Sequence, residues 1–180
     1  LTKCIRQQLN ILGDKSAENL DLQKLLLRWS NVMGRRLPVR PWRVEISKEL
    51  LSRDVNLEME LGFNCVVEKA INGFDLNPHL SKKSSRVHWF DYLQIDWGIV
   101  HFHLGTMLEP SGLMARTESL LFAFPKQNTL YFIDILGHRD FANKKLLEIM
   151  NTNWPFLVPK FHGAKSEVLT SEQIAGLRRA

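Results

Sequence analysis

Two histidines separated by a single residue are the part of this sequence best suited to chemistry. His101 and His103 lie in the segment IVHFHL (99–104), where apolar residues and histidines alternate as in a β-strand. Residues two apart in a strand point to the same face, so the two residues should share a face with Cα atoms about 6.5 Å apart. Histidine exchanges a proton near neutral pH, so such a pair can supply a general base and a general acid.

A cation and a third histidine follow in nearby connections. The segment 105–117 is long for a hairpin loop, and long loops often carry function; it contains Arg116. His138 directly follows the apolar segment LYFIDIL (130–136) and Gly137. Cleavage of RNA by its own 2′-hydroxyl requires a base, an acid and a cation for the phosphate. We therefore predict a toxin-like endoribonuclease that needs no metal or cofactor, with the catalytic residues His101, His103, Arg116 and His138.

In this hypothesis the two strand histidines transfer protons, while Arg116 and His138 contact the scissile phosphate. Lys126 is an alternative to Arg116 as the stabilising cation. Two other interpretations of the histidines stay open. They could be structural, hydrogen-bonded on a half-exposed sheet face. They could also bind zinc or a non-haem metal together with Asp134 or His138, because such metals accept these ligands. A metal-dependent enzyme ranks below the nuclease, because the sequence lacks the closely following glutamate of a cupin-like site.

The positive charge of the chain is concentrated in one stretch. The formal net charge of the 180 residues is +5, and residues 28–53 alone hold seven basic and two acidic residues, a balance of +5. Concentrated charge attracts polyanions and speeds their encounter with the protein. We predict that the residues that guide nucleic acid are Arg35, Arg36, Arg40, Arg43, Lys82 and Lys83. The leading alternative function is a non-catalytic module that binds nucleic acid or an acidic partner through this stretch.

The elements that must position these residues are helices first and a sheet later. Helical spacing of apolar residues predicts helices over 17–33, 49–71, 87–96, 140–151 and from Thr170 onward. Alternating or continuous apolar segments predict strands at 99–104, 120–124 and 130–136. Strands that are segregated from helices indicate an α+β fold, with N-terminal helices packed on a small antiparallel sheet and C-terminal helices after it. We divide the chain into a helical portion, 1–97, and a portion with the sheet and the C-terminal helices, 98–180, within one compact domain.

Local signals predict how several of these elements begin and end. Asn72-Gly73 should end the second helix, Asp140 should cap the helix over 140–151, and Thr170 with Gln173 should form a capping box. Two prolines in the segment RRLPVRPWR (35–43) exclude a helix there and favour an extended path. We favour a crossover strap packed by Trp42 and Leu37; the alternative is that this extended chain lies along a phosphate backbone.

Composition favours a protein of the cytoplasm. Hydrophobic residues make up 44% of the chain, which is enough for a core, and no apolar run approaches the 18 residues of a membrane span. No leader-like segment opens the sequence. Cys4 and Cys65 lie in no metal-ligand spacing, so we expect reduced thiols. Because Leu1 opens the chain and a helical pattern reaches Ala180, we also expect a longer natural protein.

Several segments resemble those of a set of bacterial accessory-genome proteins that carry no assigned activity. The segments are DWGIVHFHLG (96–105), YFIDILGH (131–138), NTNWP (151–155), RRLPVRPWRV (35–44) and LNPHLSKK (76–83). A looser resemblance, in the order of elements only, is to the RelE-like toxin ribonucleases, in which helices precede an antiparallel sheet with His, Arg and Tyr on one face. That resemblance implies RNA as the substrate and a cognate antitoxin protein as the partner.

Overall fold

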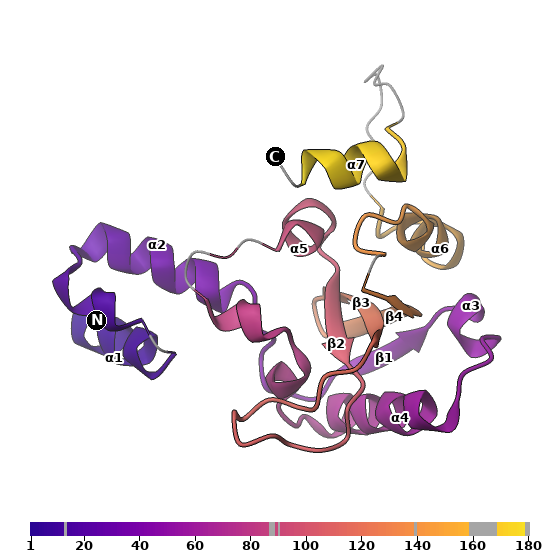
Figure 1. The fold of residues 1–180 in the computed structure, drawn as a ribbon, viewed down its shortest axis with the longest axis horizontal. Helices are drawn as coiled ribbons and strands as arrows, with labels where there is room; N and C mark the ends of the chain where they lie inside the picture. Colours follow the sequence, from indigo (N-terminus) through magenta and orange to yellow (C-terminus); the bar gives the residue numbers. More distant parts are fainter. Residues whose placement is uncertain (13, 87–88, 90, 139, 159–168, 179–180) are drawn as a thin grey trace.

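The structure is a computed structural model that describes residues 1–12, 14–86, 89, 91–138, 140–158 and 169–178 (Figure 1). Its α-helices are α1 (Thr2–Ile11), α2 (Leu22–Met33), α3 (Lys48–Leu51), α4 (Leu57–Asn72), α5 (Tyr92–Trp97), α6 (Lys145–Asn153) and α7 (Ser171–Leu177). Short 3-10 helices are η1 (Lys15–Asn19), η2 (Asn77–His79) and η3 (Lys82–Ser85). The strands are β1 (Arg43–Ile46), β2 (Val100–His103), β3 (Ser119–Lys126) and β4 (Thr129–Gly137). Within these ranges no helix has the length and apolar character that crossing a membrane requires.

The four strands form one mixed sheet in the order β1-β4-β3-β2. The pairs β2–β3 and β3–β4 are antiparallel, as the sequence predicts, and the α+β class is confirmed. The sequence missed β1, which pairs in parallel with β4 and makes the sheet mixed. β1 has only four residues and directly follows the proline-rich strap, so it carries little periodic signal. Because β1 belongs to the predicted helical portion and β4 to the other, both portions share a single sheet.

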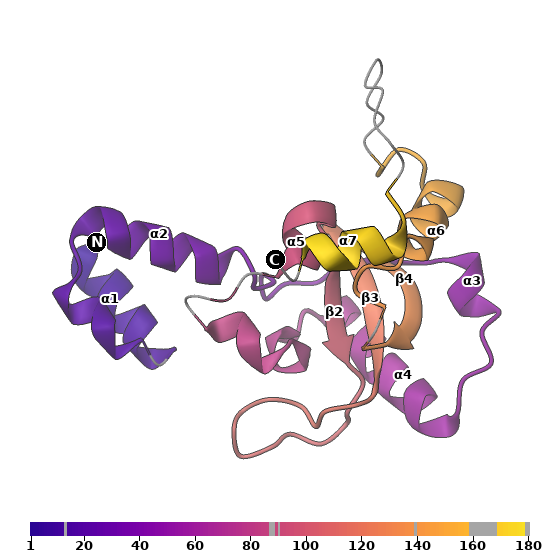
Figure 2. The ribbon, with the colours of Figure 1, turned by 45° about the horizontal axis from the view of Figure 1, so that its top comes forward.

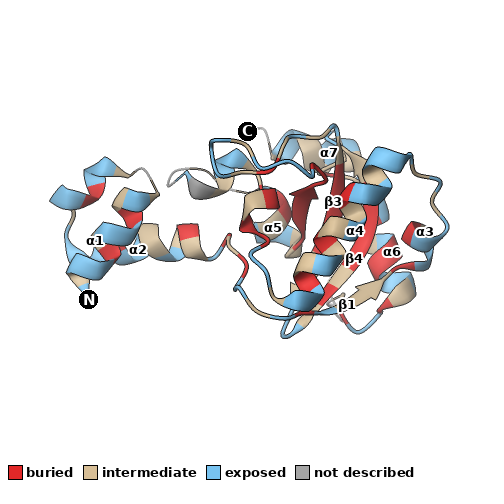
Figure 3. Ribbon diagram, turned by 90° about the horizontal axis from the view of Figure 1, so that it is seen from below, coloured by how far each residue is buried: buried red, intermediate tan, exposed pale blue. Residues whose placement is uncertain are grey.

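Helices cover both faces of the sheet (Figure 1). On one face α4 buries Val66 against Phe102 of β2 and neighbouring strand residues. On the other face α5 and α6 bury Leu93 and Ile149 against Phe122 of β3. The alternation of the strands therefore sends successive residues into two different apolar clusters, and Figure 3 shows that the strands are largely buried. The histidines of β2 alternate with Phe102, so they belong to the face that α5 and α6 cover.

The first two helices do not join this sandwich. α1, η1 and α2 bury an apolar cluster of their own, made of Ile5, Leu9, Ala17, Leu25 and Val32. Figure 2 shows this hairpin extending to one side of the sheet. The expectation that N-terminal helices pack on the sheet is thus met by α4, whereas α1 and α2 pack against each other because their apolar stripes face inward between them.

Glycine ends α4 where the sequence predicts it. Gly73 has a φ of +76°, a left-handed conformation that side chains other than glycine rarely adopt. A Cβ at this position would lie 2.7 Å from the ring of Pro41, so the strap passes directly over the helix end. The single helix predicted over 49–71 is wrong in one respect: Asn56 accepts a hydrogen bond from the Met59 N–H and starts α4 anew, so α3 is separate.

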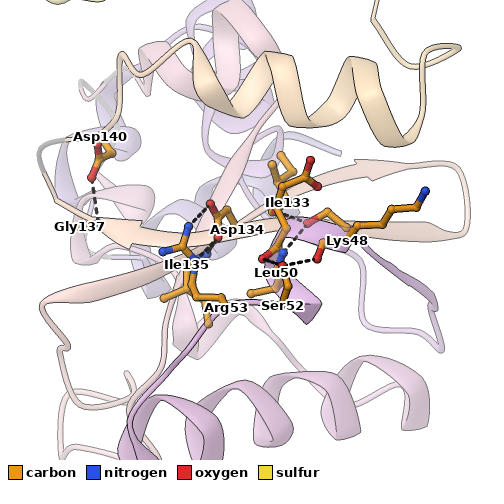
Figure 4. Close-up of polar contacts among 11 residues, drawn as sticks. Lys48, Leu50, Ser52, Arg53, Ile133, Asp134, Ile135, Gly137 and Asp140 are labelled. Atoms are coloured by element: carbon orange, nitrogen blue, oxygen red, sulfur yellow. Dashed lines mark hydrogen bonds and ion pairs between the residues drawn. The ribbon is translucent and has the colours of Figure 1, made fainter.

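At the C-terminal side one predicted cap is confirmed and one is wrong. Thr170 and Gln173 form the expected capping box of α7. Asp140 does not cap α6, which begins at Lys145 after a turn. Its carboxylate instead accepts the Gly137 N–H at 3.1 Å and so closes the turn that follows β4 (Figure 4).

Candidate functional site

The two histidines of β2 are buried on one face of the sheet. Their exposed fractions are 6% for His101 and 1% for His103, and their ring centroids lie 6.4 Å apart. The His101 ring packs edge-on against Phe141, with ring centroids 4.9 Å apart. The shared face matches the prediction, whereas the burial exceeds the half-exposed face that the structural interpretation assumed. At the edge of the sheet, the histidines are therefore set into the apolar cluster beneath α5 and α6.

A pocket of about 320 Å³ adjoins this edge of the sheet. Of the predicted catalytic residues, His101, Arg116 and His138 line it. His103 is not part of its lining. Three segments far apart in the sequence thus bring a buried imidazole, an exposed imidazole and a guanidinium group to one cavity. The pocket also receives Lys83, which the sequence analysis assigned to the guidance of nucleic acid.

His103 is held by hydrogen bonds on both sides. The Thr117 N–H donates to its Nδ1 at 3.2 Å, and the backbone carbonyl of His103 lies 2.8 Å from Nδ1 of the buried His79. The carbonyl of Thr117 lies 3.1 Å from Nε2 of His138, so Thr117 bridges the two imidazoles. Its hydroxyl accepts the Leu104 N–H and donates to the Ser119 carbonyl, which fixes the return of the loop to β3. Sequence reasoning placed Thr117 in a long loop but did not predict this role.

Burial keeps the strand histidines uncharged. Burial above all, with smaller electrostatic contributions from the neighbouring His103, His138 and Arg116, lowers the pKa of His101 to about 3. Desolvation likewise lowers the pKa of His103 to about 4. Both imidazoles are therefore neutral at physiological pH, the form in which an imidazole accepts a proton rather than donates one as a general acid.

Asp91 is the acidic side chain of the pocket, and sequence reasoning missed it. It caps α5 by accepting the Gln94 N–H, and burial raises its pKa. Its Oδ2 lies 3.8 Å from Nδ1 of His101, which is beyond hydrogen-bond distance. Among the described residues, Nδ1 of His101 has no hydrogen-bond partner. Buried polar atoms are normally paired in native structures, so an unpaired nitrogen on a residue that lines a pocket is unusual.

Arg178, at the end of α7, is a further cation of the pocket that the sequence did not reveal. Its guanidinium lies 4.4 Å from the centre of the Trp97 ring and its Nε bonds to Asp96 at 3.0 Å. Its Nη1 donates to the Phe141 carbonyl. Its Nη2 is buried and has no partner within the described ranges. Lys83, Arg116 and Arg178 thus approach one cavity from three elements, which suits it to an anionic ligand.

Arg35, predicted to guide nucleic acid, is buried instead of facing solvent. Only 6% of it is exposed, and its guanidinium donates to the carbonyls of Ser84, Arg86 and Trp89. These bonds hold the backbone at the end of η3 and at Trp89, and Lys83 of η3 and Asp91 line the pocket nearby. Arg35 therefore contributes to the site by holding backbone.

The other residues of the predicted guiding set lie apart from one another. Arg40 stacks 4.4 Å over Trp42 and donates to the Gln127 carbonyl at the β3–β4 turn. Arg43 pairs with Glu45 at 2.6 Å, Lys82 pairs with Glu109 at 3.3 Å, and Arg36 is half-buried next to Arg35. Trp42 and Leu37 are buried in the core beneath α4, so the structural interpretation of the strap is confirmed.

The described residues do not form the metal site that the sequence left open. In the described part of the chain, no three His, Cys, Asp or Glu side chains come close enough together to hold a metal ion. Asp134, the proposed third ligand, is fully buried and accepts both hydrogen bonds of a forked Arg53 guanidinium (Figure 4). The buried charge of Asp134 inside β4 is therefore balanced by an ion pair with Arg53.

Comparisons with protein-family models, curated proteins and solved structures give no match for this chain. Function must therefore be argued from the pocket itself.

Proposed function

We propose that this protein is a toxin-like endoribonuclease that cleaves RNA in the pocket beside β2 without a metal ion. One observation carries the proposal: a buried imidazole with an unpaired nitrogen, His101, shares a small cavity with His138 and Arg116. These are the base, the acid and the cation that transphosphorylation of RNA requires.

In the proposed reaction, neutral His101 takes the proton of a ribose 2′-hydroxyl. The 2′-oxygen then attacks the adjacent phosphorus, and the bond from phosphorus to the 5′-oxygen breaks. His138 is exposed to solvent in the same pocket, and in this proposal it passes a proton to the departing 5′-oxygen. The products are a 2′,3′-cyclic phosphate and a 5′-hydroxyl end.

The low pKa of His101 fits this role only when a ligand is bound. A base whose pKa is about 3 accepts protons weakly, but a phosphate in the pocket places negative charge beside the ring. Negative charge favours the protonated imidazole and raises its pKa. Arg116 and Lys83 would meanwhile stabilise the charge that develops on the phosphorus oxygens. His103 acts in this proposal as a positioning residue, since the Thr117 N–H holds its Nδ1.

The test is cleavage of a 5′-labelled single-stranded RNA by the full chain in the presence of EDTA. We expect fragments with 2′,3′-cyclic phosphate ends and no cleavage next to a 2′-deoxy substitution. His101→Gln and His138→Gln should each lower the rate by about 100-fold or more, because acid–base catalysis contributes this much. Lys15→Ala, on the exposed η1, is the matched control and should cleave like the unchanged chain. A fully active His101→Gln variant would remove the proposal.

One observation favours the alternative, a non-catalytic binding module. Burial keeps both strand histidines uncharged, so the site could hold an anion without moving protons. Binding of RNA that depends on Arg116 but leaves the RNA intact would favour this alternative. In either case the expected antitoxin partner stays a prediction; it would present carboxylates to Lys83, Arg116 and Arg178, and its complex would no longer bind RNA.

A further inference from the structure

Two aromatic side chains in the pocket have no part in the proton transfers. Trp89 and Tyr92 line the cavity together with the cations. Trp89 is half-buried, and the Arg35 guanidinium both donates to its carbonyl and lies 5.7 Å from the centre of its ring. Tyr92, in the first turn of α5, is 46% exposed. A buried arginine thus holds one aromatic ring in the pocket wall while a second stands at its rim.

Aromatic rings beside phosphate-binding cations are the chemistry that recognises unpaired nucleotides. Every nucleobase has a π-face that stacks on Trp or Tyr, and cations follow the phosphates between bases. In double-stranded RNA these π-faces are covered by neighbouring base pairs. The pocket volume of about 320 Å³ lies at the small end of ligand sites. It suits one unstacked nucleotide and excludes a base pair that remains within a helix.

We infer that the ligand of this pocket is single-stranded RNA, with one unstacked base lodged against Trp89 and Tyr92. The phosphate next to that base lies between Lys83 and Arg116, and the unpaired Nη2 of Arg178 reaches the same anion. The inference deepens the proposed function by naming the substrate class. Binding of single-stranded RNA to the pocket can be measured separately from cleavage.

The experiment uses a fluorescent 12-nucleotide RNA with 2′-O-methyl groups, which lacks the attacking hydroxyl and so cannot be cleaved by this chemistry. Binding of this strand to the full chain is measured by anisotropy and compared with the same strand annealed to its complement. Adenosine and uridine 5′-monophosphates serve as competitors that carry one base and one phosphate. We expect the single strand to bind at least about 10-fold more tightly than the duplex, because stacking contributes about 1–3 kcal/mol per base.

Variants at the two aromatic residues test the contribution of stacking. Trp89→Ala should weaken binding of the single strand roughly 10-fold and Trp89→Phe should restore most of it, because phenylalanine keeps a stacking face. Tyr92→Ala is the second variant, since its exposed ring can be removed without disturbing the core, and it should weaken binding by roughly 5-fold. Lys15→Ala should bind normally. Thermal unfolding checks that Trp89→Ala still folds.

The outcomes distinguish this inference from the proposed function. Equal affinity for the single strand and the duplex, or full affinity in both Trp89→Ala and Tyr92→Ala, overturns the inference even where RNA is cleaved. Tight, Trp89-dependent binding of the single strand, with no cleavage of unmodified RNA, supports the inference and removes the nuclease. Mononucleotides that compete only at millimolar concentration support a polymeric ligand, and nucleotides that bind more tightly than the strand overturn it.

Discussion

Asp134 and His101 are buried polar residues on two strands of the same sheet, and their surroundings differ completely. Asp134, on the inner strand β4, accepts hydrogen bonds from two nitrogens of Arg53 and from the Ile135 N–H (Figure 4). His101, on the edge strand β2, has an Nδ1 without a partner in the described ranges, and the nearest carboxylate, Asp91, is 3.8 Å away. Full pairing indicates a group that holds the fold, whereas an unpaired atom beside a cavity indicates a group kept for a ligand.

The unpaired His101 nitrogen and the paired Asp134 carboxylate affect the stability of the fold in different ways. An unpaired buried polar atom costs about 1–3 kcal/mol of stability, which a ligand can recover on binding. A buried ion pair is satisfied but costly to break, because the remaining charge is left without a counter-ion. The comparison therefore predicts opposite responses to mutation, which can be measured on the protein without any knowledge of its substrate.

The largest expected effect follows from removal of the charge in β4. Asp134→Asn leaves the Arg53 guanidinium without its counter-ion and should lower the free energy of unfolding by about 3–5 kcal/mol. Urea unfolding followed by circular dichroism measures it. The double variant Arg53→Met with Asp134→Leu should regain most of this loss, because it removes both charges. A loss below about 1 kcal/mol in Asp134→Asn would show that the pair does not stabilise the fold.

The next effect is a dependence of stability on acid. The pKa of His101 is about 3 in the folded state and about 6.5 when the chain is unfolded, so the unfolded chain binds more protons between these values. Stability should therefore be complete above pH 6.5 and decline as the pH falls toward 3. We expect this histidine to account for roughly 3 kcal/mol between pH 6.5 and 4. His101→Gln should remove this share of the slope, whereas the shares of His79 and His103, whose pKa values burial also lowers, should remain. An unchanged slope in that variant would contradict the assignment.

The smallest expected effect has the opposite sign from the first. His101→Leu removes the unpaired nitrogen from the space beside Phe141 and should raise the free energy of unfolding by roughly 1 kcal/mol. The same variant should fail to cleave or bind RNA, since function and stability often compete at such positions. A clear loss of stability would mean that the imidazole is a paired structural group, and the contrast with Asp134 would disappear.

Local sequence signals predicted much of the fold. Period-two alternation identified β2 and the common face of His101 and His103, and Gly73 and the capping box at Thr170 marked helix ends correctly. Short or ambiguous signals failed: β1 is too brief to show a period, and residues 49–71 contain no clear turn signal, so the new start of α4 at Asn56 was missed.

The pocket was only partly predictable because it depends on how distant segments pack. His101, Arg116 and His138 could be chosen from residue type and position in strands and loops. Asp91 and Arg178 could not, since they reach the cavity through the placement of α5 and α7. A count of charges likewise cannot separate exposed arginine from buried arginine, and Arg35 turned out to bind carbonyl groups inside the protein.

Thr117 gives the site a mechanical property. Its N–H holds the ring of His103 and its carbonyl bonds to the ring of His138, while Arg116 is the residue just before it. A rotation of the backbone at Thr117 would therefore break the hydrogen bonds to both imidazoles at once. The same rotation would move the neighbouring guanidinium of Arg116. A partner protein that binds the outer part of the 105–117 loop and rotates the backbone at Thr117 would therefore move three groups of the pocket together.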